Sequence, residues 1–521
     1  MAVQSPLLKE TRGGLNVFYN NKYLYSEYNP VAGAIKAAHA SFQSGSRLPG
    51  TLYIIPSPLL WYGAEIIRKK YPEETVIAVE ADTELHEIAA RYGQGIKLYR
   101  TSDLKAEALY NLKGWPFRRV EFIPLNGAFR EQQQEYAQLH TYVTGIIQQY
   151  WQNRLTLQHL VPLWIRNIYK NLSGRNSYLP LSALKTQKPV VLAGAGESLE
   201  SFPAEHVRDM FIVAIDTALP YFIQRGIRPD AVLAVDGQFF NFLDFIGLDT
   251  FADIPLIMDI TLYPGINRLF SGRKYLFMTD FWASALTGRL SSMVPDRLKA
   301  FGSVGIAGME IALNITENYV YYTGLDFCFD LGKTHARGTT YTDASSRTRT
   351  RLMPFPLAAS QLERGISVIK EHAGSSAYSD KQLLSYASIV RQRRFSKTRI
   401  HKLPGPGIDL GFSTVMPEVI SKAAAERPVN ETGTAGIAIR SGNAFLRSEQ
   451  TFLTYLYNAA YTLLSTGKGL EGFLHAYSEC DYPGLHMPDM DPEKPHPIQL
   501  KRLLMAVKLY KRTIEDVLED S

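Results

Sequence analysis

The residues with the most informative spacing in this sequence are two glycines and a serine that follow a short apolar run. Residues 188–199 read Lys-Pro-Val-Val-Leu-Ala-Gly-Ala-Gly-Glu-Ser-Leu, so the run meets Gly194, Gly196 and then Ser198. A strand, a glycine turn and a helix in this order are typical of a nucleotide-binding α/β unit. Glycine lets a phosphate approach backbone N–H groups, and the positive end of a following helix attracts the same anion. We therefore predict an anion-binding turn here.

Acidic residues end three further apolar runs of the same region. They are Asp216, which precedes Thr217, then Asp236, and then Asp326, which follows Gly324. The carboxyl ends of parallel strands face the crevice in which doubly wound sheets bind their ligands. An aspartate at such a position can instead cap the next helix, so each one alone has two interpretations. Polar groups at successive strand ends favour a ligand cleft.

A loop beyond Asp326 carries Lys333, Thr334 and His335. A histidine with an ordinary pKa of about 6.5 can accept a proton at neutral pH, and loops at strand ends often carry chemistry. His335 is therefore the candidate general base, and a structural or surface histidine is the alternative. Lys333 is a candidate phosphate ligand, and Thr334 or the loop backbone would orient the imidazole.

A second small-residue turn, Gly302 and Ser303, opens a segment that runs to Leu313 and is expected to be helical. Its small side chains allow either the close approach of a ligand or the close packing of a helix on the sheet. The sequence leaves both interpretations open.

The elements that must position these residues divide into three predicted domains, at residues 1–160, 161–411 and 412–521. The first has strands at 52–56 and 75–80 around a helix at 61–71, but prolines flank Ser57 in its first turn. Because proline has no N–H, we expect a Rossmann-like scaffold without a nucleotide site.

A helix at 150–172, which Pro162 starts or kinks, leads to the central Rossmann-like α/β domain. The third domain is predicted to be mostly helical. Its segment 497–518 has an apolar stripe opposite Lys and Arg, for which packing on the preceding helices is favoured over a membrane surface. The expected fold class is α/β.

The composition describes a soluble globular chain. Of 521 residues, 45% are hydrophobic and 20% charged, and the net charge of +6 favours anionic ligands without indicating a nucleic-acid binder. Two cysteines, Cys328 and Cys480, are too few for a disulfide framework, which fits a reducing compartment. We see no apolar run of the roughly 20 residues that a membrane span needs, no signal peptide and no metal-binding spacing. The cytoplasm is the expected location.

Together, the turn at 194–199, the strand ends at Asp216, Asp230, Asp236 and Asp326, and the 333–336 loop resemble the motility-associated factor (Maf) glycosyltransferases. The segment Tyr25–Pro30 is similar to the N-terminal domain of that family. The resemblance implies the transfer of a nonulosonic acid, of the pseudaminic or legionaminic type, from its CMP-activated form to Ser or Thr of flagellin. It implies no cofactor beyond this donor substrate, leaves a metal requirement open, and makes flagellin the protein partner.

The same motifs more distantly resemble bacterial sialyltransferases. That likeness implies that Gly194, Gly196 and Ser198 lie along the donor nucleotide, with the Gly302 turn near cytosine and ribose and Asp326 at the nucleotide edge. Two departures stand out, because Glu197 replaces a usual proline and Cys328 replaces a tyrosine that would contact phosphate.

Two alternative functions remain. One is a pterin pyrophosphokinase using ATP and magnesium, which has the same kind of central domain. The other is a non-catalytic flagellin-binding factor whose nucleotide site has decayed, which the two departures would favour.

Overall fold

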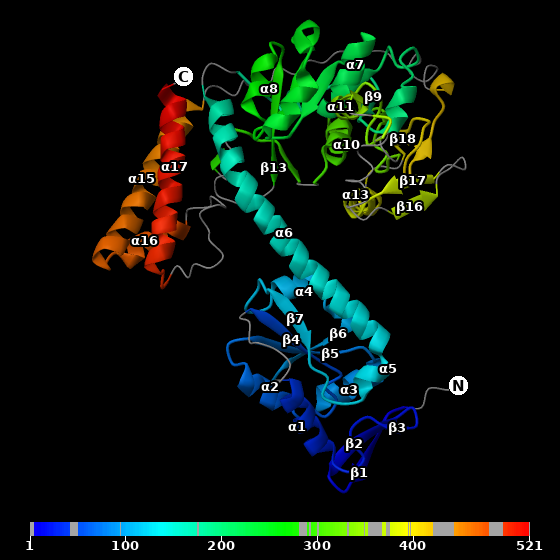
Figure 1. The fold of residues 1–521 in the computed structure, drawn as a ribbon, viewed down its shortest axis with the longest axis vertical. Helices are drawn as coiled ribbons and strands as arrows, with labels where there is room; N and C mark the ends of the chain where they lie inside the picture. The colour runs from blue at the N-terminus through cyan, green and yellow to red at the C-terminus, as the bar shows by residue number, and fades with distance from the viewer. Residues whose placement is uncertain are drawn as a thin grey trace. The chain divides into compact units, whose positions relative to one another are not determined.

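The protein forms two compact units, Met1–Leu157 and Gln158–Ser521 (Figure 1). The computed structural model describes residues 5–519, except 42–49, 94, 174–176, 281–288, 291–292, 300–301, 331–332, 348–349, 353–366, 371–375, 394, 396–397, 420–441 and 479–492. Cys480 thus lies outside the described residues. The division at Leu157 falls close to the predicted boundary at residue 160, and the C-terminal helices are part of the second unit.

The first unit contains two sheets. A three-stranded antiparallel sheet of order β1-β2-β3 precedes a four-stranded parallel sheet of order β6-β5-β4-β7. The strands are β1 (Leu7–Thr11), β2 (Gly14–Tyr19), β3 (Lys22–Tyr23), β4 (Thr51–Pro56), β5 (Thr75–Glu80), β6 (Lys97–Arg100) and β7 (Arg119–Phe122). The helices are α1 (Pro30–Ser41), α2 (Ala64–Lys70), α3 (Thr83–Arg91), α4 (Ala106–Tyr110) and α5 (Ala128–Glu131). This arrangement confirms the predicted N-terminal α/β fold.

The hydrogen-bonding groups of the turn after β4 are bonded to other residues of the protein. The N–H of Ser57, the one donor between Pro56 and Pro58, donates to the carbonyl of Val79 at 2.8 Å. The Ser57 hydroxyl donates to Glu80 Oε2 at 2.6 Å, and both side chains are buried. The turn therefore has no N–H left for a phosphate.

The helix predicted at 150–172 is longer than expected. Helix α6 (Gln133–Leu172) has 40 residues and continues through Pro162, so the proline does not start it. Leucine, isoleucine and aromatic residues on its last turns, such as Ile165 and Ile168, are buried and hold this end of the helix in the second unit.

The second unit is built on a ten-stranded sheet in which every recorded pairing is parallel. Its order is β14-β13-β12-β11-β10-β9-β15-β18-β19, with β8 also paired to β13. The strands are β8 (Leu179–Pro180), β9 (Val190–Ala193), β10 (Phe211–Ile215), β11 (Ala231–Ala234), β12 (Leu256–Asp259), β13 (Lys274–Asp280), β14 (Arg297–Lys299), β15 (Val320–Thr323), β18 (Ile400–Lys402) and β19 (Ser413–Thr414). Strands β9 to β12 and β15 are buried almost throughout, as parallel strands covered on both faces must be.

Helices and short 3₁₀ helices connect these strands. They are η2 (Leu181–Ala183), η3 (Glu197–Ser201), η4 (Asp216–Ala218), α7 (Leu219–Arg225), η5 (Phe239–Phe245), η6 (Leu248–Phe251), α8 (Pro264–Leu269), α10 (Val304–Ile315), α11 (Thr340–Arg347) and α13 (Lys381–Gln392). A separate antiparallel pair, β16 (Ser367–Lys370) and β17 (Ser376–Ser379), lies in the same unit. The predicted central α/β domain is confirmed.

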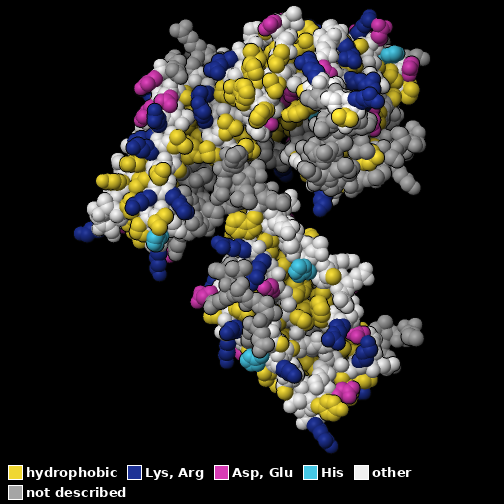
Figure 2. All heavy atoms as spheres, in the orientation of Figure 1, with side chains coloured by type: hydrophobic (Ala, Val, Ile, Leu, Met, Phe, Trp, Pro, Cys, Tyr) yellow, Lys and Arg dark blue, Asp and Glu magenta, His cyan; other side chains and the backbone are white. Residues whose placement is uncertain are grey.

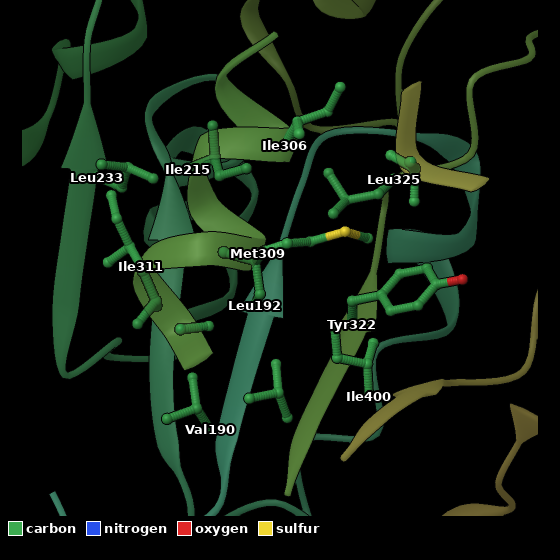
Figure 3. Close-up of a cluster of buried hydrophobic side chains, with 14 of the residues drawn as sticks. Val190, Leu192, Ile215, Leu233, Ile306, Met309, Ile311, Tyr322, Leu325 and Ile400 are labelled. Carbon is green, nitrogen blue, oxygen red and sulfur yellow. The ribbon is translucent and has the colours of Figure 1, made fainter. Parts of the chain in front are cut away.

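Helix α10 packs directly on the centre of the sheet. A Cβ on Gly305 would lie 2.6 Å from Leu325, and one on Gly308 would lie 3.0 Å from Leu192. Ile306 and Met309 point into the core between α10 and the strands (Figure 3). The small residues after Ser303 therefore allow close packing of the helix on the sheet, which is one of the two interpretations that the sequence left open.

The C-terminal part is helical, as predicted. Helix α15 (Asn443–Thr466) packs on both α16 (Leu470–Ser478) and α17 (Pro497–Glu519), and the Arg289 guanidinium lies 2.6 Å from Glu449 of α15. Leu503, Val507 and Ile514 of α17 are buried, in keeping with the favoured packing of this amphipathic helix. Within the part of the chain that the structure describes, no helix combines the length and apolar character needed to cross a membrane.

Candidate functional site

The sheet has a topological switch point between β9 and β15. The chain adds strands outward from β9 to β14 and then returns to place β15 on the other side of β9. Gly194 follows β9 and Gly324 follows β15, and the N–H of Gly196 donates to the carbonyl of Gly324 at 2.8 Å. The glycine turn and the Gly324–Asp326 strand end therefore meet where an open α/β sheet offers its ligand crevice.

Ser198 and Asp326 join these two turns. The N–H and hydroxyl of Ser198 donate to the two carboxylate oxygens of Asp326 at 2.8 and 2.5 Å, and the hydroxyl accepts from the N–H of Gly324 at 2.7 Å. Both side chains are buried. Ser198, predicted to lie along the donor nucleotide, thus uses its polar groups inside the protein.

The two glycines are required by the same contact. A Cβ on Gly196 would lie 2.5 Å from Asp326 Oδ2, and one on Gly194 would lie 2.4 Å from the Gly324 carbonyl oxygen. Close packing of two strand ends thus accounts for the Gly-x-Gly spacing. The N–H groups of Gly194, Gly196, Ser198 and Leu199 are bonded within the protein, so a phosphate at this turn must use those of Ala195 or Glu197.

The segment after the turn is not the α-helix that was expected. Glu197–Ser201 forms a five-residue 3₁₀ helix, and Pro203 follows two residues later. Proline disfavours the helical conformation of the residue before it, which limits the length of this helix. The positive end of an α-helix, expected to attract the phosphate at this point, is therefore missing.

The loop that carries the candidate base is docked on the turn. The N–H of Ala336 donates to the carbonyl of Ala195 at 2.8 Å, and the Lys333 ammonium lies 2.5 Å from Glu197 Oε1 and 3.2 Å from Glu200 Oε1. Burial lowers the pKa of Lys333, but the hydrogen bond to Glu197 and the two carboxylate charges outweigh it and raise that pKa. Lys333, predicted to hold donor phosphate, is therefore occupied by two carboxylates of the protein itself.

His335 is held on two sides. The Thr334 hydroxyl lies 3.0 Å from Nδ1, and the imidazole stacks on Tyr341 with 5.3 Å between ring centroids. Burial lowers the pKa of His335 to about 4, so the ring is neutral near pH 7. When Nδ1 donates to Thr334, Nε2 is the nitrogen that can accept a proton.

Asp216 and Asp236 lie at the same edge of the sheet. Asp216 is buried and accepts from the N–H of Thr217 at 2.8 Å and from Asn241 Nδ2 at 3.3 Å. Asp236 accepts from the N–H of Gln238 at 2.9 Å. Neither aspartate is the N-cap of the helix that follows, because Ile215 precedes η4 and Gln238 precedes η5, and neither of these helices has a side-chain cap hydrogen bond. The capping alternative therefore finds no support at either position.

Asp244 joins these two aspartates, although sequence reasoning did not select it. Burial, with the charges of Asp244 and Asp236, raises the pKa of Asp216 to about 7, and burial also raises those of Asp236 and Asp244. Oδ1 of Asp244 is buried without a hydrogen-bond partner among the described residues. The three carboxyl groups thus form one acidic cluster beside Tyr341. Burial and the negative charges of the cluster raise the pKa of Tyr341.

Tyr341 was also missed. Its ring stacks on His335 and lies beside the acidic cluster. It belongs to helix α11, six residues beyond the histidine, for which the sequence predicted no role. For Asp244 there was a signal, because one acid stands within the aromatic run Phe-Phe-Asn-Phe-Leu-Asp-Phe directly after a strand end.

Two other predicted positions flank the site. Gly302 has a left-handed backbone (φ 72°), and Ser303 precedes α10, whose first turn lies beside Leu325 at the same edge of the sheet. Cys328 is buried. Among the described residues, no group of three or more His, Cys, Asp or Glu side chains is arranged to hold a metal ion.

The fold and the switch-point site together define a doubly wound α/β protein with a ligand crevice at its central strand ends. A family model described as 6-hydroxymethylpterin diphosphokinase MptE-like matches residues 164–332. Among solved structures, the Maf glycosyltransferase from Magnetospirillum magneticum AMB-1 is similar with a TM-score of 0.54 at 14% sequence identity, covering 99% of this chain and 87% of that chain. The chain therefore has the fold of a Maf glycosyltransferase over nearly its whole length, whereas the sequence motifs indicated this likeness for the central domain and the segment Tyr25–Pro30.

The sequence also has a relative in Treponema pallidum (strain Nichols). An uncharacterized protein of that organism is 26% identical over 432 residues, which cover 78% of this chain and 74% of the relative.

Proposed function

We propose that this protein is a glycosyltransferase that moves a nonulosonic acid from its CMP-activated form to Ser or Thr hydroxyls of flagellin in the cytoplasm. The observation that carries the proposal is the extent of the structural likeness. It covers 99% of the chain, whereas the diphosphokinase-like family model covers only residues 164–332. A Maf-type enzyme thus accounts for the N-terminal sheets and the C-terminal helices as well as for the central domain.

The crevice at β9 and β15 suits the donor nucleotide. Ala195 and Glu197 can each offer an N–H at the turn, and the first turn of the 12-residue helix α10 adds a positive dipole end at the same edge. Gly302 and Ser303 would lie beside the nucleotide as that helix begins. These backbone N–H groups, and not the Lys333 ammonium, would hold the phosphate, because Lys333 is paired with Glu197.

His335 is suited to accept the proton of the acceptor. In the reaction the acceptor oxygen attacks the anomeric carbon, the bond from that carbon to the phosphate oxygen breaks, and CMP leaves with the electron pair. The acceptor proton passes to Nε2 of His335, while Thr334 holds Nδ1. A donor phosphate near the ring would favour the imidazolium that forms, which counteracts the effect of burial on the pKa.

Two measurements test the proposal. CMP should raise the melting temperature of the purified protein, because a ligand that binds only the folded state stabilises it. Flagellin from cells that have the gene should exceed in mass the flagellin from cells that lack it by one or more sugar residues. Unchanged flagellin mass together with no stabilisation by CMP would contradict the proposal.

The second candidate function is diphosphoryl transfer from ATP and magnesium to a pterin alcohol, which the match of the family model to residues 164–332 favours. In that case ATP with magnesium, and not CMP, would stabilise the protein. The non-catalytic alternative rested on Glu197 and Cys328. Glu197 is paired with Lys333, so it places no unpaired charge in the crevice, and Cys328 is buried.

A further inference from the structure

An exposed apolar surface begins next to the proposed base. It comprises Phe239 (57% exposed), Phe240 (70%), Leu243 (42%) and Ile246 (66%) from the segment after β11, together with Tyr341 (48%). We call this set the aromatic patch. Hydrophobic side chains gather over α8, the helix beside η5, on the face seen in Figure 2. Large apolar side chains in such a dense exposed group mark an interaction surface more often than isolated ones do.

The segment that carries the aromatic patch is fixed by contacts with neighbouring side chains of the protein. Phe245 is buried against Phe270, and the ring of Phe239 packs edge-on against Tyr263 with centroids 5.6 Å apart. Asn241, in the same 3₁₀ helix, donates to Asp216 of the acidic cluster. A surface whose backbone is fixed in this way loses little conformational entropy on binding a partner.

The patch is also continuous with the site. The imidazole of His335 stacks on the ring of Tyr341, and the neighbouring Thr340 hydroxyl donates to the carbonyl of Leu243 at 3.4 Å. A molecule whose hydroxyl reaches His335 therefore passes over Tyr341 and meets the η5 side chains beyond it.

We infer that the aromatic patch is the docking surface for the acceptor protein and binds an apolar segment of flagellin next to the modified hydroxyl. The inference rests on the proposed function and specifies how the acceptor is recognised. A water molecule or a small sugar acceptor has no use for four large exposed apolar side chains, whereas protein interfaces use such aromatic anchors.

The test separates acceptor binding from donor chemistry. The double variant Phe240→Ser/Ile246→Ser removes the two most exposed members of the patch, which touch neither the acidic cluster nor His335 in any recorded contact. Met505→Ser/Leu509→Ser is the matched control, because these side chains are comparably exposed (75% and 58%) on α17. Each protein is assayed for CMP release from the CMP-sugar without acceptor, for transfer to flagellin, and for its melting temperature.

In the patch variant we expect kcat/KM for flagellin to fall by about tenfold or more, because truncated interface anchors have effects of this size. Acceptor-independent CMP release and melting temperature should stay at wild-type values, and the control should match wild type in all three assays. Transfer within about twofold of wild type would overturn the inference, as would a parallel loss of CMP release. The same proteins are also compared for self-association and for binding to anionic vesicles, and a change only in one of these would assign the patch to another occupant and overturn the inference too. A wild-type protein that modifies no flagellin would instead contradict the proposed function.

Discussion

The ammonium group of Lys333 lies 2.5 Å from Oε1 of Glu197, across 136 residues of sequence. The pair sits between the loop that carries His335 and the turn that follows β9, so it fastens the candidate base to the candidate nucleotide site. It also explains how a carboxylate is tolerated beside a crevice that should bind a phosphate. The same pairing prevents Lys333 from serving the phosphate unless the ion pair opens.

Replacing this carboxylate should leave the lysine with one carboxylate partner, Glu200 at 3.2 Å. In Glu197→Gln we expect a loss of stability of about 1 kcal/mol from the partly buried pair, and tighter CMP binding because Lys333, held only by Glu200, can turn more easily to the phosphate. Calorimetric titration with CMP and chemical denaturation measure the two effects. Glu205→Gln, which breaks the exposed pair with Arg208, is the control and should change neither. Weaker CMP binding in Glu197→Gln would show that the ion pair itself supports the site.

The aspartates at the strand ends should respond differently to the same substitution. Asp326 accepts hydrogen bonds on both oxygens from Ser198, so Asp326→Asn would set an amide N–H₂ against a donor. We expect it to lose about 1–3 kcal/mol of stability. Asp236→Asn keeps an acceptor for the single N–H of Gln238 and should lose less than about 1 kcal/mol. Urea denaturation compares the two variants, and equal losses would refute the structural role of the Ser198–Asp326 contact.

Gly196 should not tolerate even one methyl group. Because a Cβ there would lie 2.5 Å from the Asp326 carboxylate, Gly196→Ala should destabilise the fold by about 2 kcal/mol or more and not only weaken nucleotide binding. Gly472 of α16 is the matched control, since a Cβ there meets nothing within 4 Å. Gly472→Ala should be neutral or slightly stabilising. A Gly196→Ala protein that melts like wild type would favour the phosphate-approach explanation of this glycine.

Much of the second unit could be predicted because its strands are short, apolar on both faces and end in polar residues. The run at 190–193 and those ending at Asp216, Asp236 and Asp326 are all strands, and all end at one edge of the sheet. That the motifs would meet also followed, since parallel strands share their carboxyl edge.

The sequence did not show which residues from different strand ends contact one another. Gly196 has the residue type of a phosphate turn, but its neighbour in space is Asp326, and Lys333 has Glu197 as its partner. Such contacts depend on strand order, which local patterns do not specify. Helix α6 was underestimated although its first turns carry apolar residues at helical spacing, at Tyr136, Leu139, Val143 and Ile147, and all four are buried.

The acidic cluster should make stability depend on pH. Burial near Asp236 and Asp244 raises the pKa of Asp216 from 3.8 to about 7, so the folded protein keeps this proton where the unfolded chain has lost it. The contribution of Asp216 to stability is therefore full below its unfolded pKa and is lost as the pH rises towards about 7. The free energy of unfolding of Asp216→Asn relative to that of wild type should thus rise by on the order of 2 kcal/mol when the pH increases from about 5 to about 8. Denaturation at the two pH values measures it, and a pH-independent difference would count against the raised pKa.

His335→Ala should separate proton transfer from nucleotide binding. Loss of a general base lowers rates by about 10²–10⁴-fold, so transfer to flagellin should nearly cease while CMP still stabilises the protein. His206→Ala, outside the site, is the control and should transfer normally.

Because burial lowers the pKa of His335 to about 4, the wild-type enzyme without donor should keep this base neutral in mildly acidic solution. Its kcat/KM should then show no fall with an apparent pKa near 6.5, the value of an exposed histidine, down to about pH 5. Transfer by His335→Ala at close to the wild-type rate would place the base elsewhere. A loss of CMP binding as large as the loss of transfer would make His335 a contact of the nucleotide phosphate.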